Sequence, residues 1–431
     1  MSRRRWFDWH SWTGITAGLL LFVVCWTGTF ATLSREIDWL LDPAQRVQPA
    51  AQRASFGQIA DAAQRAHPQA TVSWISAPLY ARSAAEVVMD APGGGSLRVW
   101  VDPYRARVQG TTTYFNVQRF FRSLHMSLFD WGGSGAGYYV VCALSLLLLV
   151  SLVTSLVFYK RWWRGFATLK TGRGLRVLLS DAHKLAGVWS LWFVVVIAVT
   201  GGWYLFEMAR WQIDPEGSQG QFTVPAPPDL AAAPARMDID TLVARVRALR
   251  PTLEVRNISV GEDGAFQADG QDTHLLVRDR ANVVHLDGRT GALLRDQHAH
   301  DLDAYWRWSD TADPLHFGDF GGLPTKLVWC VFGLLMTGLC LTGAYLHYQR
   351  IVARGGDRQA LSRHARRIAL GVTCLLLAAT AAGGWAEISG YAIDGDASRV
   401  WTMTPASVWV FLAAWLAVTL AVIAVWVRKL R

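Results

Sequence analysis

Four of the 11 histidines stand in sequence contexts that occur twice along the 431-residue chain. His10 and His183 each lie four residues before a glycine, near the start of an apolar run. His125 and His316 each belong to a Leu-His-x-x-x-Phe sequence that precedes another apolar run. Two neutral imidazoles on opposite faces of a haem form a common axial ligand set. The spacing therefore favours two haem sites, one held by His10 with His183 and the other by His125 with His316.

Other roles for these histidines stay open. Singly, His10 and His183 could be interfacial caps, and His125 and His316 could be hydrogen-bonded loop anchors. Zinc fits less well, because each pair supplies two ligands and no Cys, Asp or Glu accompanies them at ligand spacing. His347 could replace one inner ligand. The spacing of His298 and His300 is compatible with a metal contact, although a solvated loop explains it better.

The composition indicates a membrane protein. Hydrophobic residues make up 52% of the chain and charged residues only 17%, below the share typical of soluble proteins. Six runs lack Asp, Glu, Lys and Arg and are about long enough to cross a bilayer as helices; they cover residues 14–33, 137–159, 185–206, 327–347, 368–385 and 407–427. All five cysteines fall inside these runs without Cys-x-x-Cys spacing, which argues against a disulfide framework, a zinc ribbon, an iron–sulfur cluster or covalently attached haem.

Lysine and arginine predict the orientation. They cluster before the first run, after the second, after the fourth and at the C-terminus, so both termini and these loops are expected in the cytoplasm. The net charge of +9 is thereby explained without a nucleic-acid partner. The two long segments between spans should lie outside, and each reads as α+β. The first has a helix at 55–67 and strands at 71–75, 86–89 and 97–101; the second has a helix at 239–249 and strands at 255–260, 274–277 and 283–286.

The predicted organisation follows from these runs, with the His–span–domain–His–span order occurring twice. Its boundaries are residues 1–34 (first span), 35–135 (outer domain), 136–159 (second span), 160–182 (basic loop), 183–206 (third span), 207–324 (outer domain), 325–348 (fourth span), 349–366 (basic loop), 367–388 (fifth span), 389–406 (outer loop) and 407–431 (sixth span with a cytoplasmic tail).

Aromatic residues gather around the outer histidines. Tyr114, Phe121 and Trp131 lie near His125 in the sequence, and Trp306 and Trp308 lie near His316. They could cover a haem or form a docking platform for a bulky ligand. They could equally form the hydrophobic seam between an outer domain and the membrane.

At these residues the chain resembles a known family. The stretches 101–108 (VDPYRARV) and 286–293 (LDGRTGAL) are similar to the ends of PepSY domains. The spans that open with His10-x-Trp-x-Gly and close with Thr342-Gly-Ala-Tyr-Leu resemble those of PepSY-associated transmembrane proteins. The resemblance implies a mainly α membrane protein of the bacterial inner membrane, with six transmembrane helices in a duplicated bundle and two periplasmic α+β PepSY-like domains. It also implies two molecules of haem b, ligated by His10 and His183 inside and by His125 and His316 outside.

Members of that family include siderophore reductases, so the resemblance implies a haem-dependent, one-electron reduction of a ferric siderophore that releases ferrous iron. No Gly-x-Gly-x-x-Gly sequence follows a predicted strand, so electrons are expected from a quinol or a separate reductase. The expected partners are that donor, the ferric siderophore and membrane lipid, with no nucleic acid. Two alternatives remain: a component of a siderophore or iron permease, and a non-catalytic PepSY protein that binds or regulates a partner.

Overall fold

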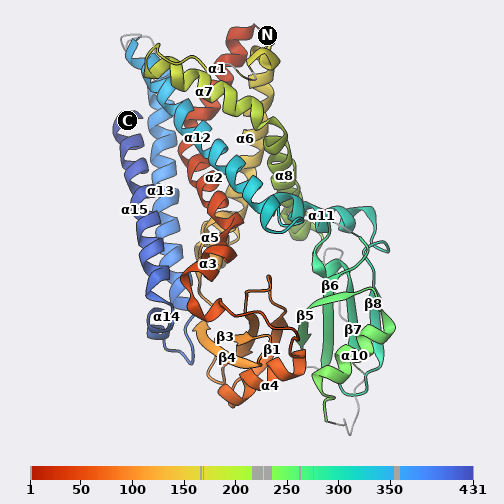
Figure 1. Ribbon diagram of the computed structural model, residues 1–431. Helices are drawn as coiled ribbons and strands as arrows, with labels where there is room; N and C mark the ends of the chain where they lie inside the picture. The colour runs from red at the N-terminus through yellow and green to blue at the C-terminus, as the bar shows by residue number, and fades with distance from the viewer. Residues whose placement is uncertain are drawn as a thin grey trace.

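The computed structural model describes residues 2–165, 167, 169–215, 227, 235–261, 264–274, 276–353 and 360–430. Figure 1 shows two parts, a bundle of long helices and a β-sheet with its own helices at one end of the bundle. The mainly α membrane architecture expected from the apolar runs is thus observed, together with an antiparallel sheet.

Five helices are long and apolar enough to cross a membrane: α6 (Ala136–Phe158), α8 (Leu191–Ile213), and parts of α12 (Leu323–Ala353), α13 (Ala360–Gly390) and α15 (Ala406–Leu430). A sixth span results if α1 (Arg3–Thr16) and α2 (Gly18–Thr32), which meet at 66°, are taken together. The hydroxyls of Thr13 and Thr16 donate to carbonyls one turn earlier, in the last turn of α1. Such bonds favour helix bending, which places the break at Ala17.

The third apolar run is also divided between two helices. α7 (Leu175–Trp189) carries its first residues, and α8 begins after Ser190. Consequently His10 and His183 both lie on a helix that precedes a break, α1 and α7 respectively. Two shorter helices carry the outer histidines: α5 (Val117–Ser127) carries His125 and leads towards α6, and α11 (Ala304–Phe317) carries His316 and leads towards α12.

The strands of both outer segments form one antiparallel sheet of eight strands in the order β4-β3-β2-β1-β5-β6-β7-β8. The strands are β1 (Thr71–Ser76), β2 (Ala85–Asp90), β3 (Ser96–Asp102), β4 (Arg107–Thr113), β5 (Glu254–Val260), β6 (Ala265–Gln271), β7 (Val283–Asp287) and β8 (Leu293–Gln297). The two segments meet where β1 pairs with β5, with Ile75 opposite Ile258. They therefore share one sheet.

Some strand predictions were wrong. The described residues of 274–277 form a loop, in which Leu276 has a φ of 61°. The sequence analysis also missed β4, β6 and β8. These strands lack a clear apolar alternation, because β4 is rich in threonine, β6 contains Asp269 and Gly270, and β8 ends in polar residues. Pairing within the sheet, rather than local hydrophobicity, determines that they are strands.

One face of the sheet is covered by α4 (Phe56–Ala66) and α10 (Ile239–Leu249), whose apolar sides form a single core with both halves of the sheet. Ser55 begins α4 with a capping box completed by Gln58. The Asp240 carboxylate of α10 accepts hydrogen bonds from the Ser55 hydroxyl and, at 2.8 Å, from the Gly57 backbone N–H. The two helices are thus joined by polar contacts as well as by the shared core.

The helix α3 (Ser34–Leu41) connects the sheet to the bundle. Its Glu36 accepts hydrogen bonds from Lys326 of α12 at 2.7 Å and from the Tyr80 hydroxyl at 2.6 Å. Its Asp38 accepts the backbone N–H groups of Val117 and Gln118 at 2.8 and 2.9 Å, which caps the start of α5. These bonds satisfy two of the free N–H groups at the start of α5, so α3 fixes the helix that carries His125.

In the second half, α11 is attached to the sheet by ion pairs. Arg280 contacts Asp310 at 2.9 Å, and Arg278 pairs with Asp313. Asp313 also accepts a hydrogen bond from the Tyr204 hydroxyl of α8. The helix that carries His316 is therefore held between the sheet and the bundle.

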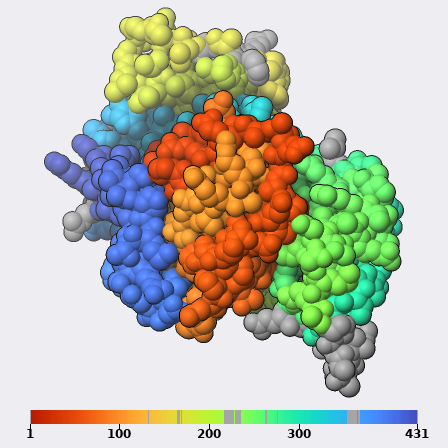
Figure 2. Space-filling model, turned by 60° about the horizontal axis from the view of Figure 1, so that its bottom comes forward, coloured from red at the N-terminus to blue at the C-terminus, as the bar shows by residue number. Residues whose placement is uncertain are grey.

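The last helices pack against the first half. Trp415 of α15 lies 5.0 Å from Phe121 between ring centroids, and Trp26 of α2 donates to Thr419 at 3.0 Å. The loop before α14 (Ser398–Met403) meets the β2–β3 turn, where the Asp394 carboxylate accepts the Gly93 N–H at 2.9 Å. Figure 2, viewed towards the sheet end, shows this C-terminal part (blue) against the first half (red to orange).

Removing one partner of the Glu36–Lys326 pair should destabilise the protein strongly, because the two side chains are 15% and 9% exposed. We expect Glu36→Gln to cost about 3 kcal/mol, since it leaves a largely buried ammonium without its carboxylate. The measurement is the Tm of the detergent-solubilised protein, and the Glu36→Gln/Lys326→Met double variant should recover part of the loss. The control is Arg256→Gln, whose ion pair with Glu254 is 44% and 70% exposed and should contribute less than about 1 kcal/mol. Equal Tm losses for Glu36→Gln and this control would contradict the prediction.

Candidate functional site

Two cavities lie inside the helical bundle, and each is lined by one predicted histidine pair. The inner cavity has a volume of about 290 Å³ and is lined by His10 and His183, together with His347 and Arg350. The outer cavity has a volume of about 340 Å³ and is lined by His125 and His316. Most of the remaining wall in both is apolar, as expected for a site that solvates a hydrophobic ring system. The structure therefore brings the four histidines together in the predicted pairs.

Each of the four imidazoles is held through its Nδ1 atom. The Nδ1–H of His10 donates to the Ser151 carbonyl at 3.0 Å, and that of His125 donates to the Val24 carbonyl at 3.0 Å. A carbonyl oxygen can only accept, so both rings carry their proton on Nδ1 when neutral. Their Nε2 atoms then have a lone pair available for a metal.

The other two imidazoles, one from each predicted pair, are held through threonine hydroxyls. The Nδ1 of His183 lies 2.8 Å from the Thr342 hydroxyl, and the Nδ1 of His316 lies 2.8 Å from the Thr200 hydroxyl. Both hydroxyls donate to carbonyls of their own helices at 2.7 Å, which leaves their oxygens to accept from the imidazoles. Among the described residues, no protein group hydrogen-bonds the Nε2 atom of His10, His125, His183 or His316. Metal-ligating histidines typically bind the metal through one ring nitrogen and donate a hydrogen bond to the protein from the other, as these rings do from Nδ1.

The outer pair has a separation compatible with one shared metal. The ring centroids of His125 and His316 are 6.1 Å apart. Two imidazoles that ligate one ion from opposite sides, each through a bond of about 2 Å, place their centroids roughly 6 Å apart. In the part of the chain that the structure covers, no group of three or more His, Cys, Asp or Glu converges as a metal site. A haem needs only two protein ligands, so it fits this donor set, whereas a zinc ion with three or four protein ligands does not.

Glycines at the cavity walls also fit a bulky planar group. A Cβ built on Gly14 would meet nothing within 4 Å, and one on Gly187 would touch Leu339 only at 3.9 Å, so both leave room beside the inner pair. Gly18 is different, because its Cβ would meet Trp426 of α15 at 3.1 Å. In the outer cavity a Cβ on Gly28 would lie 2.7 Å from the His125 ring, so the imidazole packs directly against the α2 backbone.

His347, the alternative inner ligand, lies in the wall of the same cavity. Its Nδ1 is 2.8 Å from the Ser11 hydroxyl of α1, next to Arg350. The structure thus places three histidines around the inner cavity, and the ligand role of each stays a prediction.

A third and larger cavity of about 1250 Å³ lies between the bundle and the uncovered face of the sheet. Its walls come from α3, strands β1 to β3, the start of α5 and the start of α12. Arg122 of α5 lines both this cavity and the outer histidine cavity. Burial lowers the pKa of the Arg122 guanidinium, and nearby Arg119 and Arg278 act in the same direction. A ligand in this large cavity would therefore lie next to the outer histidine pair.

Of the five residues predicted to form a docking platform, one lines the large cavity and four do not. Tyr114 lines the large cavity. Phe121 is 0% exposed and packs between Phe30 and Trp415, so its prediction as a docking residue is wrong: it faces the core of the bundle. Trp131 lies against Gly383 of α13, and Trp306 and Trp308 lie on α11 beside Arg210 and Trp203. These three tryptophans are not in the cavity wall.

Apart from Tyr114, the aromatic and charged residues that line the cavity were missed by the sequence analysis. Trp74, Glu86, Arg98 and Trp100 lie at alternate positions of β1 to β3, on the face opposite the apolar core. The period of two was present in the predicted strands and could have identified this face. Arg35 lies in α3 and Arg82 in the loop between β1 and β2, and no local pattern indicates that they line the same cavity.

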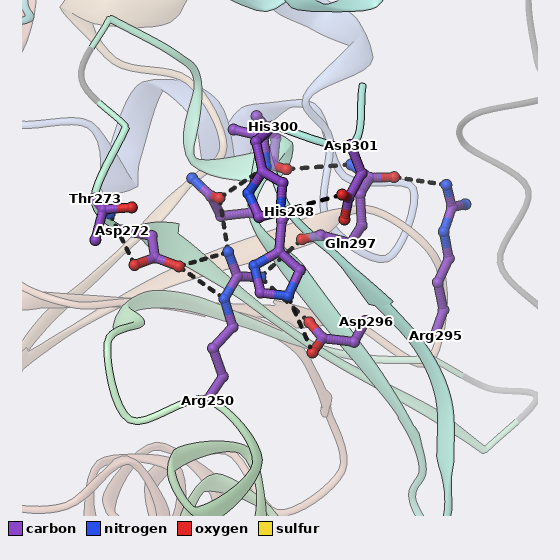
Figure 3. Close-up of polar contacts among 12 residues, drawn as sticks. Arg250, Asp272, Thr273, Arg295, Asp296, Gln297, His298, His300 and Asp301 are labelled. Carbon is purple, nitrogen blue, oxygen red and sulfur yellow. Dashed lines mark hydrogen bonds and ion pairs between the residues drawn. The ribbon is translucent and has the colours of Figure 1, made fainter. Parts of the chain in front are cut away.

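His298 and His300 belong to a polar cluster at the end of β8 (Figure 3). His298 lies 3.4 Å from Asp296, and His300 lies 3.2 Å from Asp301. Beneath them the buried Arg250 contacts Asp272 at 2.7 Å. The cluster lies at β8, an edge strand of the sheet, and none of the residues labelled in Figure 3 lines either histidine cavity.

The family is shown by a direct comparison. A family model described as the PepSY-associated TM region matches residues 7–350. The chain belongs to this family. The PepSY-associated match includes all four paired histidines and both halves of the sheet. The chain is also 26% identical to the uncharacterized protein PA4219 of Pseudomonas aeruginosa over 280 residues, which is 60% of this chain and 69% of that protein.

Replacing Gly28 by alanine should disturb the outer cavity of this PepSY-associated protein. The added Cβ would lie 2.7 Å from His125, whose Nδ1 bond to Val24 restricts its movement. We expect Gly28→Ala to lower stability by about 1–3 kcal/mol through overpacking. The measurement is the Tm, with Gly338→Ala on α12 as the control, because a Cβ there meets nothing within 4 Å. A Tm for Gly28→Ala at or above that of the control would mean that the imidazole is not fixed as described.

Proposed function

We propose that this protein is an inner-membrane di-haem oxidoreductase that passes electrons across the membrane and reduces a ferric siderophore on the outer side. The observation that supports it best is the pair of cavities in one bundle, each lined by a predicted histidine pair that is held at Nδ1 and whose Nε2 atoms have no hydrogen-bond partner among the described residues. Family membership agrees with this proposal but does not specify the reaction.

His10 and His183 would hold the inner haem b, and His125 and His316 the outer one. Bis-imidazole haems supply one-electron carriers when bound. The protein's own contribution is to fix the rings through Ser151, Thr342, Val24 and Thr200 and to surround both sites with apolar side chains. Gly14 and Gly187 leave the backbone approachable beside the inner pair.

The large cavity would bind the ferric complex next to the outer pair, with Arg122 in the wall between them. Siderophores bind ferric iron through hard oxygen ligands, and ferrous iron is held more weakly by such ligands. One-electron reduction in this cavity would therefore release iron. Neither product nor substrate needs to enter the apolar bundle.

The orientation in this proposal follows the basic loops. Both termini would be cytoplasmic, the sheet with its two PepSY-like halves would be periplasmic, and the two halves would derive from an internal duplication. A quinol or a separate reductase would deliver electrons at the inner histidines.

A permease component is the second candidate. The 66° break between α1 and α2 favours it, because transporters often bind substrates at discontinuous helices. A non-catalytic regulatory role would leave the histidines as structural residues only. Purification distinguishes these readings, since the oxidoreductase requires haem absorbance that changes on reduction.

We expect the purified protein to contain two haems per chain. His125→Ala and His316→Ala should each reduce the content to about one, because a bis-imidazole site loses half of its axial ligands. The measurement is the pyridine haemochrome content divided by protein concentration. His67→Ala, on the sheet unit, is the control and should keep two haems. A colourless wild-type protein, or full haem content in both outer variants, would overturn the proposal.

The Thr200 hydroxyl should tune the outer site. It accepts the Nδ1–H of His316 at 2.8 Å, which makes this imidazole a stronger electron donor. Thr200→Val should raise the midpoint potential of one haem, whereas Thr200→Ser keeps the hydroxyl and should leave it close to the wild-type value. Spectroelectrochemical titration measures both. Equal potentials in Thr200→Val and wild type would exclude this role.

A further inference from the structure

The large cavity between bundle and sheet has an excess of positive charge. Five arginines line it: Arg35, Arg82, Arg98, Arg119 and Arg122. Only Arg98 has a carboxylate partner in the described part of the chain, Glu86 at 2.9 Å. The wall is therefore cationic unless its other carboxylates offset the remaining four.

The other carboxylates of the wall are already engaged. Glu36 pairs with Lys326 at 2.7 Å, and Asp38 accepts two backbone N–H groups at the start of α5. Asp313, the carboxylate that acts on Arg122, is bound to Arg278 and to the Tyr204 hydroxyl. Four guanidinium groups thus line this cavity without a carboxylate at ion-pair distance among the described residues, which favours an anionic occupant.

The arginines lie at two depths. Arg35 and Arg82 are exposed, whereas Arg119 and Arg122 on α5 are half-buried. Arg122 also lines the outer histidine cavity. A path of positive charge therefore leads from the surface to the wall shared with His125 and His316. Such a path raises the local concentration of anions at its inner end.

Aromatic rings share this wall with the arginines. The Tyr114 ring lies under two guanidinium groups, with Arg98 at 4.2 Å and Arg119 at 5.2 Å from its centroid. Trp39, Trp74 and Trp100 line the same space. Trp100 is 6% exposed, and its buried indole N–H has no acceptor among the described residues. Flat aryl groups stack well on indole rings and on guanidinium planes.

We propose that this cavity selects ferric complexes of net negative charge built from aryl oxyanions, such as catecholates or phenolates, over neutral hydroxamate complexes. The inference rests on the proposed function, because it takes the cavity as the binding site of the ferric complex. The arginines attract the anionic complex, and the aromatic rings bind its aryl groups. A neutral complex of similar size gains only the second set of contacts.

The test measures binding of the gallium(III) complexes of a tris-catecholate and of a tris-hydroxamate to the full chain in nanodiscs. Gallium(III) replaces ferric iron without being reduced under these conditions, so binding is observed apart from electron transfer. We expect the catecholate complex to bind at least about tenfold more tightly at low salt, and this ratio to decrease as salt screens the arginines. Equal affinities, or tighter binding of the hydroxamate complex, would overturn the inference.

Matched variants locate the effect. Arg35→Gln/Arg82→Gln should weaken catecholate binding by about tenfold and leave hydroxamate binding unchanged, because these exposed side chains do not support the fold. Arg245→Gln, at an exposed position of α10 on the other face of the sheet, is the control and should change neither affinity. If the Arg35→Gln/Arg82→Gln variant binds the catecholate complex as tightly as the control and the wild type do, Arg35 and Arg82 do not select the ligand.

The two proposals can fail separately. Charge selectivity in a protein without redox-active haem would leave the cavity assignment standing and refute the oxidoreductase. Haem-dependent reduction of both complexes with equal affinities would support the oxidoreductase and refute the selectivity.

Discussion

The hydrogen bond at the Nδ1 atom of each paired imidazole is the interaction on which the bundle's site depends. A histidine at membrane depth is costly unless both ring nitrogens find partners. Here the protein supplies a partner for Nδ1 in all four cases, from Ser151, Val24, Thr342 or Thr200, and supplies none for Nε2 among the described residues. The bonds fix the tautomer and the direction of each ring.

The sheet stabilises that arrangement from outside the bundle. Pairing of β1 with β5 unites strands that lie more than 170 residues apart in sequence, so both halves move as one unit with their helices α4 and α10. Asp38 of α3, a helix bound to the segment before β2 through Glu36 and Tyr80, caps α5, and Arg278 and Arg280 of the sheet unit bind α11. The two helices with the outer histidines are therefore positioned by the same sheet. This explains how a 6.1 Å separation between rings on different helices is maintained.

The C-terminal helices extend the support of the first half. Trp415 and Thr419 of α15 pack against the aromatic side of α2 and α5, and Glu387 of α13 accepts a hydrogen bond from Ser123, two residues before His125. Arg119, which like Ser123 belongs to α5, donates from its Nε to the Tyr391 hydroxyl at 3.3 Å. α5 is thus bounded by the sheet on one side and by α13 and α15 on another. These two helices, which have no counterpart in the second half, act as packing elements for α5.

The sequence by itself determined the features that depend on local composition. Long uncharged runs specify membrane helices, and the repeated contexts of His10, His183, His125 and His316 predicted which of these imidazoles line a common cavity. Only the tertiary structure decided which polar groups hold each Nδ1, that Phe121 faces the core, and that Arg35, Arg82 and Trp100 line one cavity with Arg122. Those contacts join loops, strands and helices distant in sequence, and their partners depend on how the β1–β5 pairing and the ties from α3 place the sheet against the bundle. No local pattern encodes such long-range positions, which arise from packing of the whole chain.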